Sequence, residues 1–154
     1  MKFSSATATA RAPTTCSSRA STAWCSNGWR PPAANCPRIQ LIGENRWRIG
    51  TRTNHARLML PTGLARIAGY ADGVGLWLGH IVYGIDATGG PRLSSLVQRA
   101  RRHDLAVHVY TLRQDDLPPG VADFDALLEL VYDTLGADGA FTDFPDLARA
   151  FLDR

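Results

Sequence analysis

Residues 136–152, GADGAFTDFPDLARAFL, contain the pattern that decides the fold class. Residues 139–142 have the length and the apolar character of a buried strand. The next four residues, Asp143-Phe144-Pro145-Asp146, place a proline and an acid in the first turn of a helix. A strand that leads directly into a helix is the repeating unit of α/β proteins. The stretch therefore predicts a strand at 139–142 and a helix from there to the C-terminus.

The residues before this stretch predict one more strand and one more helix. Residues 106–111, AVHVYT, form an apolar run that predicts a strand. Apolar residues then recur at helical spacing at Phe124, Leu127, Leu128, Val131, Tyr132 and Leu135. Gly136 follows directly, and glycine is the residue type that most often ends helices. The chain thus alternates between strand and helix over its last 50 residues or so.

Two further helices are predicted upstream. The first begins after Pro61, with Leu64, Ile67 and Ala68 on one face, and ends near Tyr70. The second has the apolar stripe Leu93, Leu96, Val97 and Ala100, and it ends near His103 and Asp104.

Ile39–Ile42 predicts a buried strand, closed by the turn-forming residues 43–45. Residues 72–75 are expected to break the helix before them, and residues 76–83 predict either a short strand or an irregular loop. Alternating strands and helices give a parallel sheet with right-handed crossovers. A closed barrel of eight such units requires about 250 residues, whereas this body offers three secure strands. We therefore expect an α/β fold that is a C-terminal piece of a TIM-type (β/α)8 barrel, with about three to four βα units.

Residues 1–37 have a different composition. They contain no Leu, Ile, Val, Asp or Glu, and 19 of the 37 are Ala, Ser or Thr. Four of the 17 Lys and Arg residues lie here, which leaves 13 against 14 acids in residues 38–154. The basic balance therefore belongs to this segment alone, and nucleic-acid binding by the body is not expected. We expect residues 1–37 to be an unstructured segment.

The most economical explanation of this segment is a shifted reading frame. Residues 13–22 can be re-read in the alternative frame as DDLFLQSFD, which has the pattern of a strand. A single Lys in the whole chain suggests a GC-rich gene, which makes that re-reading possible. A natural low-complexity tail and a presequence are the alternatives, and a sequencing error would give the same apparent shift.

Cys16, Cys25 and Cys36 match neither a zinc ribbon nor a CxxC pair in their spacing. No run is long and apolar enough to predict a membrane span, and no signal peptide is visible, so a cytoplasmic protein is expected from the sequence as written.

Four stretches in order resemble the C-terminal part of glycerophosphodiester phosphodiesterases, especially of the periplasmic type. They are IQLIGEN (39–45), GLARIAGYADGVG (63–75), AVHVYTLRQDDLP (106–118) and GADGAFTDFPDLARAFL (136–152). The resemblance implies hydrolysis of a glycerophosphodiester to glycerol 3-phosphate and an alcohol. It also implies a divalent cation, calcium or magnesium, and two histidines as general acid and base. For an intact member of the periplasmic type, the resemblance implies a location in the periplasm.

The family's catalytic motifs are a His-Arg pair on the first strand, acids on the second, a second His and a later Glu. No stretch of this chain resembles them. We therefore expect no catalytic residue, no metal ligand and no bound cation in this chain. We also expect poor solubility, because a barrel piece would leave its sheet edges open.

The resemblance implies substrate contact by Tyr110, at the end of the strand 106–111. Arg113 could offer its guanidinium to phosphate, and Phe144 could form a wall of the pocket. The alternatives are barrel packing for Tyr110, a solvated Arg113 and a helix-stapling Phe144.

His108 is expected to be an interior residue, since a lone His in an apolar strand is more often packed than catalytic. His55, His80 and His103 have no acid at useful spacing. Asp115, Asp116, Asp143 and Asp146 fit turn and helix N-terminal roles without a metal.

The first hypothesis is thus a C-terminal part of a phosphodiesterase, inactive alone. The second is a small domain that binds a phosphorylated ligand or pairs with an N-terminal barrel fragment.

Overall fold

The computed structural model describes residues 37–47 and 53–154. The predictions made for residues 1–37 therefore lie outside the described residues, apart from Pro37.

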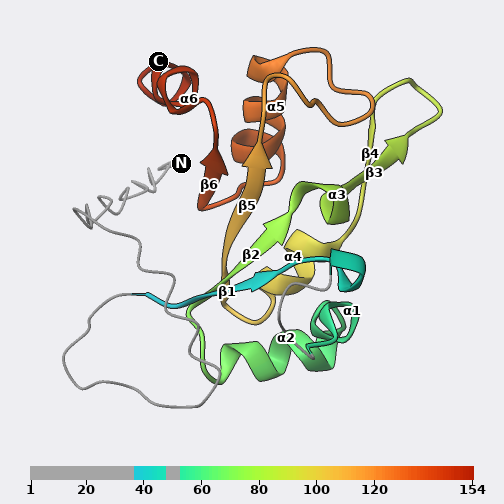
Figure 1. Ribbon diagram of the computed structural model, residues 1–154, viewed down its shortest axis with the longest axis vertical. Helices are drawn as coiled ribbons and strands as arrows, with labels where there is room; N and C mark the ends of the chain where they lie inside the picture. Colours follow the sequence, from blue (N-terminus) through green and yellow to red (C-terminus); the bar gives the residue numbers. More distant parts are fainter. Residues whose placement is uncertain (1–36, 48–52) are drawn as a thin grey trace, which may run out of the picture. The chain divides into compact units, whose positions relative to one another are not determined.

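A four-stranded parallel sheet forms the centre of the described chain (Figure 1). Its strands are β1 (Ile39–Ile42), β2 (Gly73–Trp77), β5 (Ala106–Leu112) and β6 (Gly139–Thr142). Their order in the sheet is β1-β2-β5-β6, and each adjacent pair is parallel. Each strand of this sheet therefore lies beside the next one along the chain, so the sheet winds in one direction only.

Helices connect the strands of this sheet. The helices α1 (His55–Leu58) and α2 (Pro61–Ala68) precede β2, and α3 (Leu78–Ile81) follows it. Next come α4 (Leu96–Arg101) before β5, and α5 (Phe124–Glu129) before β6, with α5 continuing into the π-helical turn η2 (Leu130–Thr134). The helix α6 (Pro145–Leu152) follows β6, and the short 3-10 helix η1 (Asn45–Trp47) follows β1. No helix of the described residues is long and apolar enough to cross a membrane.

One face of the sheet packs against these helices. Val74, Leu76, Val107 and Val109 alternate along β2 and β5 and are fully buried. They form one apolar cluster with the buried faces of α2, α4 and α5, including Leu64, Val97 and Leu127. Burial of this kind contributes roughly 1.5–3 kcal/mol per large apolar side chain. This cluster is the hydrophobic core of the described chain.

The other face of the sheet, here named the open face, carries a different set of residues. Strand register places on it Ile39, Leu41, Gly73, Gly75, Trp77, His108, Tyr110, Gly139 and Phe141. The core cluster includes none of the large apolar residues among them, and Leu41 and Phe141 are 43% and 48% exposed. A sheet that winds in one direction with its core on one face has the arrangement of a sector of a (β/α)8 barrel, in which the open face would be the interior.

Several predicted elements are confirmed. The strands Ile39–Ile42 and Gly139–Thr142 have the predicted bounds, and α6 begins at Pro145 with Asp146 in its first turn. Gly136 ends the predicted helix of residues 124–135 with a φ of 65°, a left-handed conformation that glycine adopts without strain.

The helix before residues 72–75 does end as predicted, since α2 stops at Ala68, but the prediction missed that β2 begins at Gly73. Its glycines hid the strand, and each of them lies close to an atom of a neighbouring strand. A Cβ on Gly75 would lie 2.3 Å from a methyl carbon of Leu41, and one on Gly73 would lie 2.6 Å from the Ala106 carbonyl oxygen. The small residues let neighbouring strands carry larger side chains on the open face.

The region after β2 also differs from the prediction. Residues 76–83 are divided among β2, α3 and β3 (Val82–Ile85), and β3 pairs in antiparallel fashion with β4 (Pro91–Leu93). Leu93 therefore ends a strand, and α4 begins only at Leu96. This hairpin was missed because its strands are short and partly exposed, so they show no clear alternation.

Candidate functional site

The carboxyl ends of the four parallel strands meet at one edge of the sheet, where α/β barrels assemble their active sites. Glu44 follows β1, Arg113 follows β5 and Asp143 follows β6. Trp77 is the last residue of β2, and His80 comes three residues later in α3. Tyr110 lies near the end of β5, opposite Trp77 in the register of the sheet. We take this edge as the candidate site.

Tyr110 is half-buried on the open face. Its hydroxyl donates a hydrogen bond of 2.9 Å to the carbonyl oxygen of Ile42 at the end of β1. Its ring meets Phe141 edge to face, with 6.4 Å between the ring centroids. Burial raises the pKa of Tyr110 above the ordinary value, so the phenol stays protonated and a donor. The structure therefore gives Tyr110 a role in joining strands, and its predicted contact with substrate stays a prediction.

Arg113 is held by two carboxylates. Its Nε lies 3.0 Å from Oδ1 of Asp115 and its Nη2 lies 2.7 Å from Oδ2 of the same residue, which makes a bidentate pair. Its Nη1 lies 2.7 Å from Oδ2 of Asp143, at the end of β6. Arg113 lowers the pKa of Asp115 through this hydrogen bonding. A phosphate would have to compete with these acids for the guanidinium, and the predicted phosphate contact stays a prediction.

Phe144 packs toward the helices. Its ring lies 5.8 Å from that of Phe124, measured between centroids, and it contacts the core cluster. Its backbone N–H donates a 3.0 Å hydrogen bond to Oγ1 of Thr142. The structure thus places Phe144 against Phe124 of α5, as the alternative of a helix-stapling Phe144 predicts. The neighbouring Asp143 connects β6 with Arg113. A substrate role for Phe144 stays a prediction.

Glu44 and His80 form a pair that sequence reasoning missed. The expectation that His80 lacks a paired acid is wrong, because its Nε2 lies 3.5 Å from Oε1 of Glu44. The His80 side chain is only 8% exposed, and its Nδ1 has no hydrogen-bond partner among the described residues. Burial lowers the pKa of His80, and Glu44 partly opposes that shift. His80 is therefore largely neutral at neutral pH, beside a charged carboxylate.

The sequence could have indicated this pair only through the pairing of two strands that lie far apart in the chain. Glu44 follows one parallel strand and His80 follows the strand beside it, so their side chains come from the same edge of the sheet.

Both residues line a cavity of about 260 Å³, together with Gly43, Asn45, Arg46, Ala56 and Met59. A larger hollow of about 690 Å³ lies along α1 and α2, and its lining residues offer no carboxylate or imidazole.

Comparison with known proteins identifies the family. Residues 19–147 match the Glycerophosphoryl diester phosphodiesterase family. The chain belongs to this family. The resemblance found in the sequence is therefore confirmed at the level of the family, and the matched range includes part of the segment 1–37.

Two curated relatives carry the name glycerophosphodiester phosphodiesterase. The protein from Treponema pallidum (strain Nichols) is 36% identical over 100 residues, which are 64% of this chain and 28% of the relative. The protein from Haemophilus influenzae (strain ATCC 51907 / DSM 11121 / KW20 / Rd) is 32% identical over 124 residues, or 74% of this chain and 34% of the relative. The matched parts thus span about a third of the length of these relatives.

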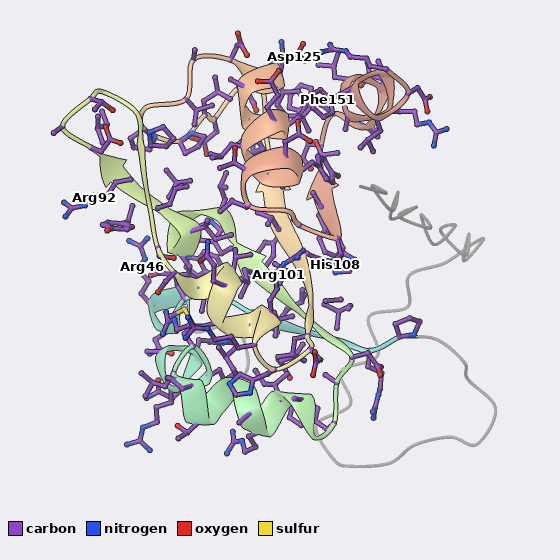
Figure 2. All side chains as sticks on the ribbon, turned by 180° about the vertical axis from the view of Figure 1, so that it is seen from behind. Arg46, Arg92, Arg101, His108, Asp125 and Phe151 are labelled. Carbon is purple, nitrogen blue, oxygen red and sulfur yellow. The ribbon has the colours of Figure 1, made fainter. Side chains whose placement is uncertain are left out.

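His108, labelled in Figure 2, lies on β5 on the open face. Its ring packs against Gly139, because a Cβ added to Gly139 would lie 2.6 Å from Cδ2 of His108. The centroids of the His108 and Phe141 rings are 6.3 Å apart. Its Nδ1 is buried without a hydrogen-bond partner among the described residues. These contacts agree with packing, the role expected for His108 from the sequence.

The divalent cation implied by the family does not fit the described part of the chain. No group of three or more His, Cys, Asp or Glu side chains comes together among residues 37–47 and 53–154. Calcium and magnesium need several oxygen ligands at once. The described residues by themselves therefore form no such set of ligands.

Proposed function

We propose that residues 38–154 form the C-terminal part of a glycerophosphodiester phosphodiesterase barrel of the periplasmic type. Such an enzyme cleaves a glycerophosphodiester, for example glycerophosphocholine, to glycerol 3-phosphate and an alcohol, in lipid and glycerol metabolism. The family match over residues 19–147 supports the family and the reaction class in this proposal.

The open face supports the assignment to a barrel. A sheet with its core on one face needs a second apolar layer, and in a barrel that layer is made by the facing strands. Leu41 and Phe141 are large apolar residues that remain 43% and 48% exposed on this face. Further strands of a barrel would cover both of them.

The chemistry would then come from other strands of the barrel. We propose that the cation, calcium or magnesium, and the catalytic histidines are held there, because the described residues bring together no group of three or more ligand side chains. This chain would contribute Tyr110 and Arg113 at the rim of the pocket and would not hydrolyse the substrate by itself. In the proposed assembly Tyr110 orders the strand ends, and Arg113 faces the phosphate once it is released from its acids.

Residues 1–37 are proposed to come from a shifted reading frame, and the family match from residue 19 onward makes the position of any shift the point to test. Resequencing the gene across the codon of Pro37 tests this idea. An insertion or deletion that restores a family-like frame upstream is the expected result, and an unbroken frame would refute the proposal.

A second candidate function is complementation without catalysis of its own. The exposed apolar residues of the open face favour it, because they would be buried by a separate N-terminal barrel fragment. A domain that binds a phosphorylated ligand is the weaker form of this candidate, since Arg113 is already paired with two acids.

The proposal is tested by assaying the purified full chain for glycerol 3-phosphate release from glycerophosphocholine. Calcium or magnesium is added, and the Treponema pallidum relative serves as the positive control. We expect no release by this chain alone. Release by the chain alone at a rate near that of the control would overturn the proposed need for other strands.

A further inference from the structure

A cation is already held at the candidate edge, between a carboxylate and an aromatic ring. The Nε of Arg46 lies 2.7 Å from Oε2 of Glu44. The guanidinium carbon of the same residue lies 5.9 Å from the ring centroid of Trp77. The first contact is an ion pair, and the second has the geometry of a cation–π interaction.

A second indole lies beside the Trp77 ring. Trp47 meets Trp77 edge to face, with 5.2 Å between the ring centroids and 71° between the ring planes. Both rings rest on glycines, because a Cβ on Gly43 would lie 3.0 Å from the Trp47 ring and one on Gly79 would lie 2.5 Å from the Trp77 ring. A larger residue at Gly79 would displace the Trp77 ring, and one at Gly43 would press against the Trp47 ring.

His80 supports this arrangement from below the surface. Its ring meets Trp77 at 87°, with 5.2 Å between centroids, while its Nε2 faces Glu44. Because burial lowers the pKa of His80, this imidazole adds little positive charge at neutral pH. The negative charge of Glu44 is thus balanced mainly by Arg46.

Arg46 is a weakly held occupant. Its side chain is 71% exposed. Ion pairs at such exposure contribute little to stability, because water and salt screen them. A competing cation could therefore replace the guanidinium at small cost, while the Arg46 side chain moves into water.

We propose that Glu44, Trp47 and Trp77 form a binding site for an organic cation of the quaternary ammonium class, which replaces the guanidinium of Arg46. Such a cation has no N–H to donate, so its recognition depends on aromatic faces and a nearby negative charge. The site supplies both. If the proposed function is correct, the cation is the alcohol part of the glycerophosphodiester, and in that respect the inference rests on it.

Binding is measured on the full chain without any hydrolysis. Choline is titrated and the indole N–H signals of Trp47 and Trp77 are followed by NMR. We expect saturable shifts of both signals, and none with 3,3-dimethylbutanol, the uncharged carbon analogue of choline. Equal shifts with the neutral analogue would show that charge is not recognised and would overturn the site.

Variants then separate the parts of the site. Glu44→Gln and Trp77→Leu should each weaken choline binding by about fivefold or more. Arg46→Ala should tighten it, because the internal competitor is gone. Arg92→Ala is the matched control, since Arg92 lies 5.4 Å from the Tyr83 ring in the β3–β4 hairpin and should leave the affinity unchanged. Absence of saturable binding by both the original chain and Arg46→Ala would refute the inference.

The two proposals fail in different ways. If choline binds but no assembled enzyme ever cleaves glycerophosphocholine, the proposed function fails and the cation site stands. If an assembled enzyme cleaves glycerophosphocholine and choline does not bind, the cation site fails and the proposed function stands.

Discussion

The hydroxyl of Tyr110 and the carbonyl oxygen of Ile42 are 2.9 Å apart although 68 positions separate the two residues in the chain. The hydrogen bond connects β5 with β1, and both of these strands pair with β2, which lies between them. It fixes the carboxyl ends of the sheet at the place where a barrel enzyme would bind its substrate. A residue expected to touch substrate thus also organises the edge that carries the site.

Removing this hydroxyl should destabilise the chain. We expect Tyr110→Phe to lower the free energy of unfolding by about 1 kcal/mol, because the Ile42 carbonyl loses its partner. Urea denaturation at low protein concentration measures the change. Tyr132→Phe is the control, since the Tyr132 hydroxyl makes no hydrogen bond to another described residue. An equal loss in both variants would mean that the Tyr110 hydrogen bond is not the cause.

Arg113 should control the titration of Asp115. The guanidinium lowers the pKa of this carboxyl, so Arg113→Gln should move the pKa of Asp115 upward toward its ordinary value. The Asp86 carboxyl, whose pKa is lowered mainly by its hydrogen bond from Thr88, should not respond. Carboxyl-carbon NMR resolves the two residues. If Asp115 does not move, Arg113 is unpaired in solution and free to meet a phosphate.

His80 should make stability depend on pH. Burial lowers its folded pKa below the ordinary value of 6.5, Glu44 opposes this shift, and His55 adds to it. The unfolded chain then binds the proton more readily than the folded chain. The contribution of His80 is therefore present above an unfolded pKa of about 6.5 and is lost as the pH falls through the folded pKa.

The His80→Gln variant should weaken this dependence, as measured by urea denaturation midpoints at about pH 7.5 and about pH 5.5. The matched control is His103→Gln, in the turn after α4, which should keep the original dependence. A midpoint that changes equally in the original chain and in His80→Gln would exclude His80 as the source.

The open face should drive self-association. Substitution of both Leu41 and Phe141 by Lys should raise, several fold, the protein concentration at which light scattering begins, because these side chains are 43% and 48% exposed on that face. Substitution of both Tyr83 and Ile85 by Lys is the control, since they are 56% and 55% exposed on the hairpin. An equal gain in the control pair would place the association surface elsewhere.

Sequence reasoning was most successful where the pattern was local. The strand at 139–142 and the helix that starts at Pro145 follow from a short apolar run and a proline, and both are confirmed. It failed at β2, because Gly73 and Gly75 look like a turn until the side chain of Leu41 on the adjacent strand is known. It also missed the β3–β4 hairpin, whose strands are partly exposed.

The candidate site was only partly predictable for the same reason. Tyr110 and Arg113 do lie at the end of β5, as their position in the sequence required. The Glu44–His80 pair depends on the register of β1 against β2, which no local pattern contains. The two tryptophans meet through that same pairing.

The central claim is that this chain is one part of a phosphodiesterase barrel whose catalytic groups lie on other strands. The full chain is mixed with the part of the Haemophilus influenzae relative that lies outside the 124 matched residues, and calcium is added. Release of glycerol 3-phosphate from glycerophosphocholine is then measured. The account predicts no release by either piece alone and release by the mixture, which is lost when both Leu41 and Phe141 are replaced by Lys. A mixture that forms a one-to-one complex and remains inactive would contradict the account.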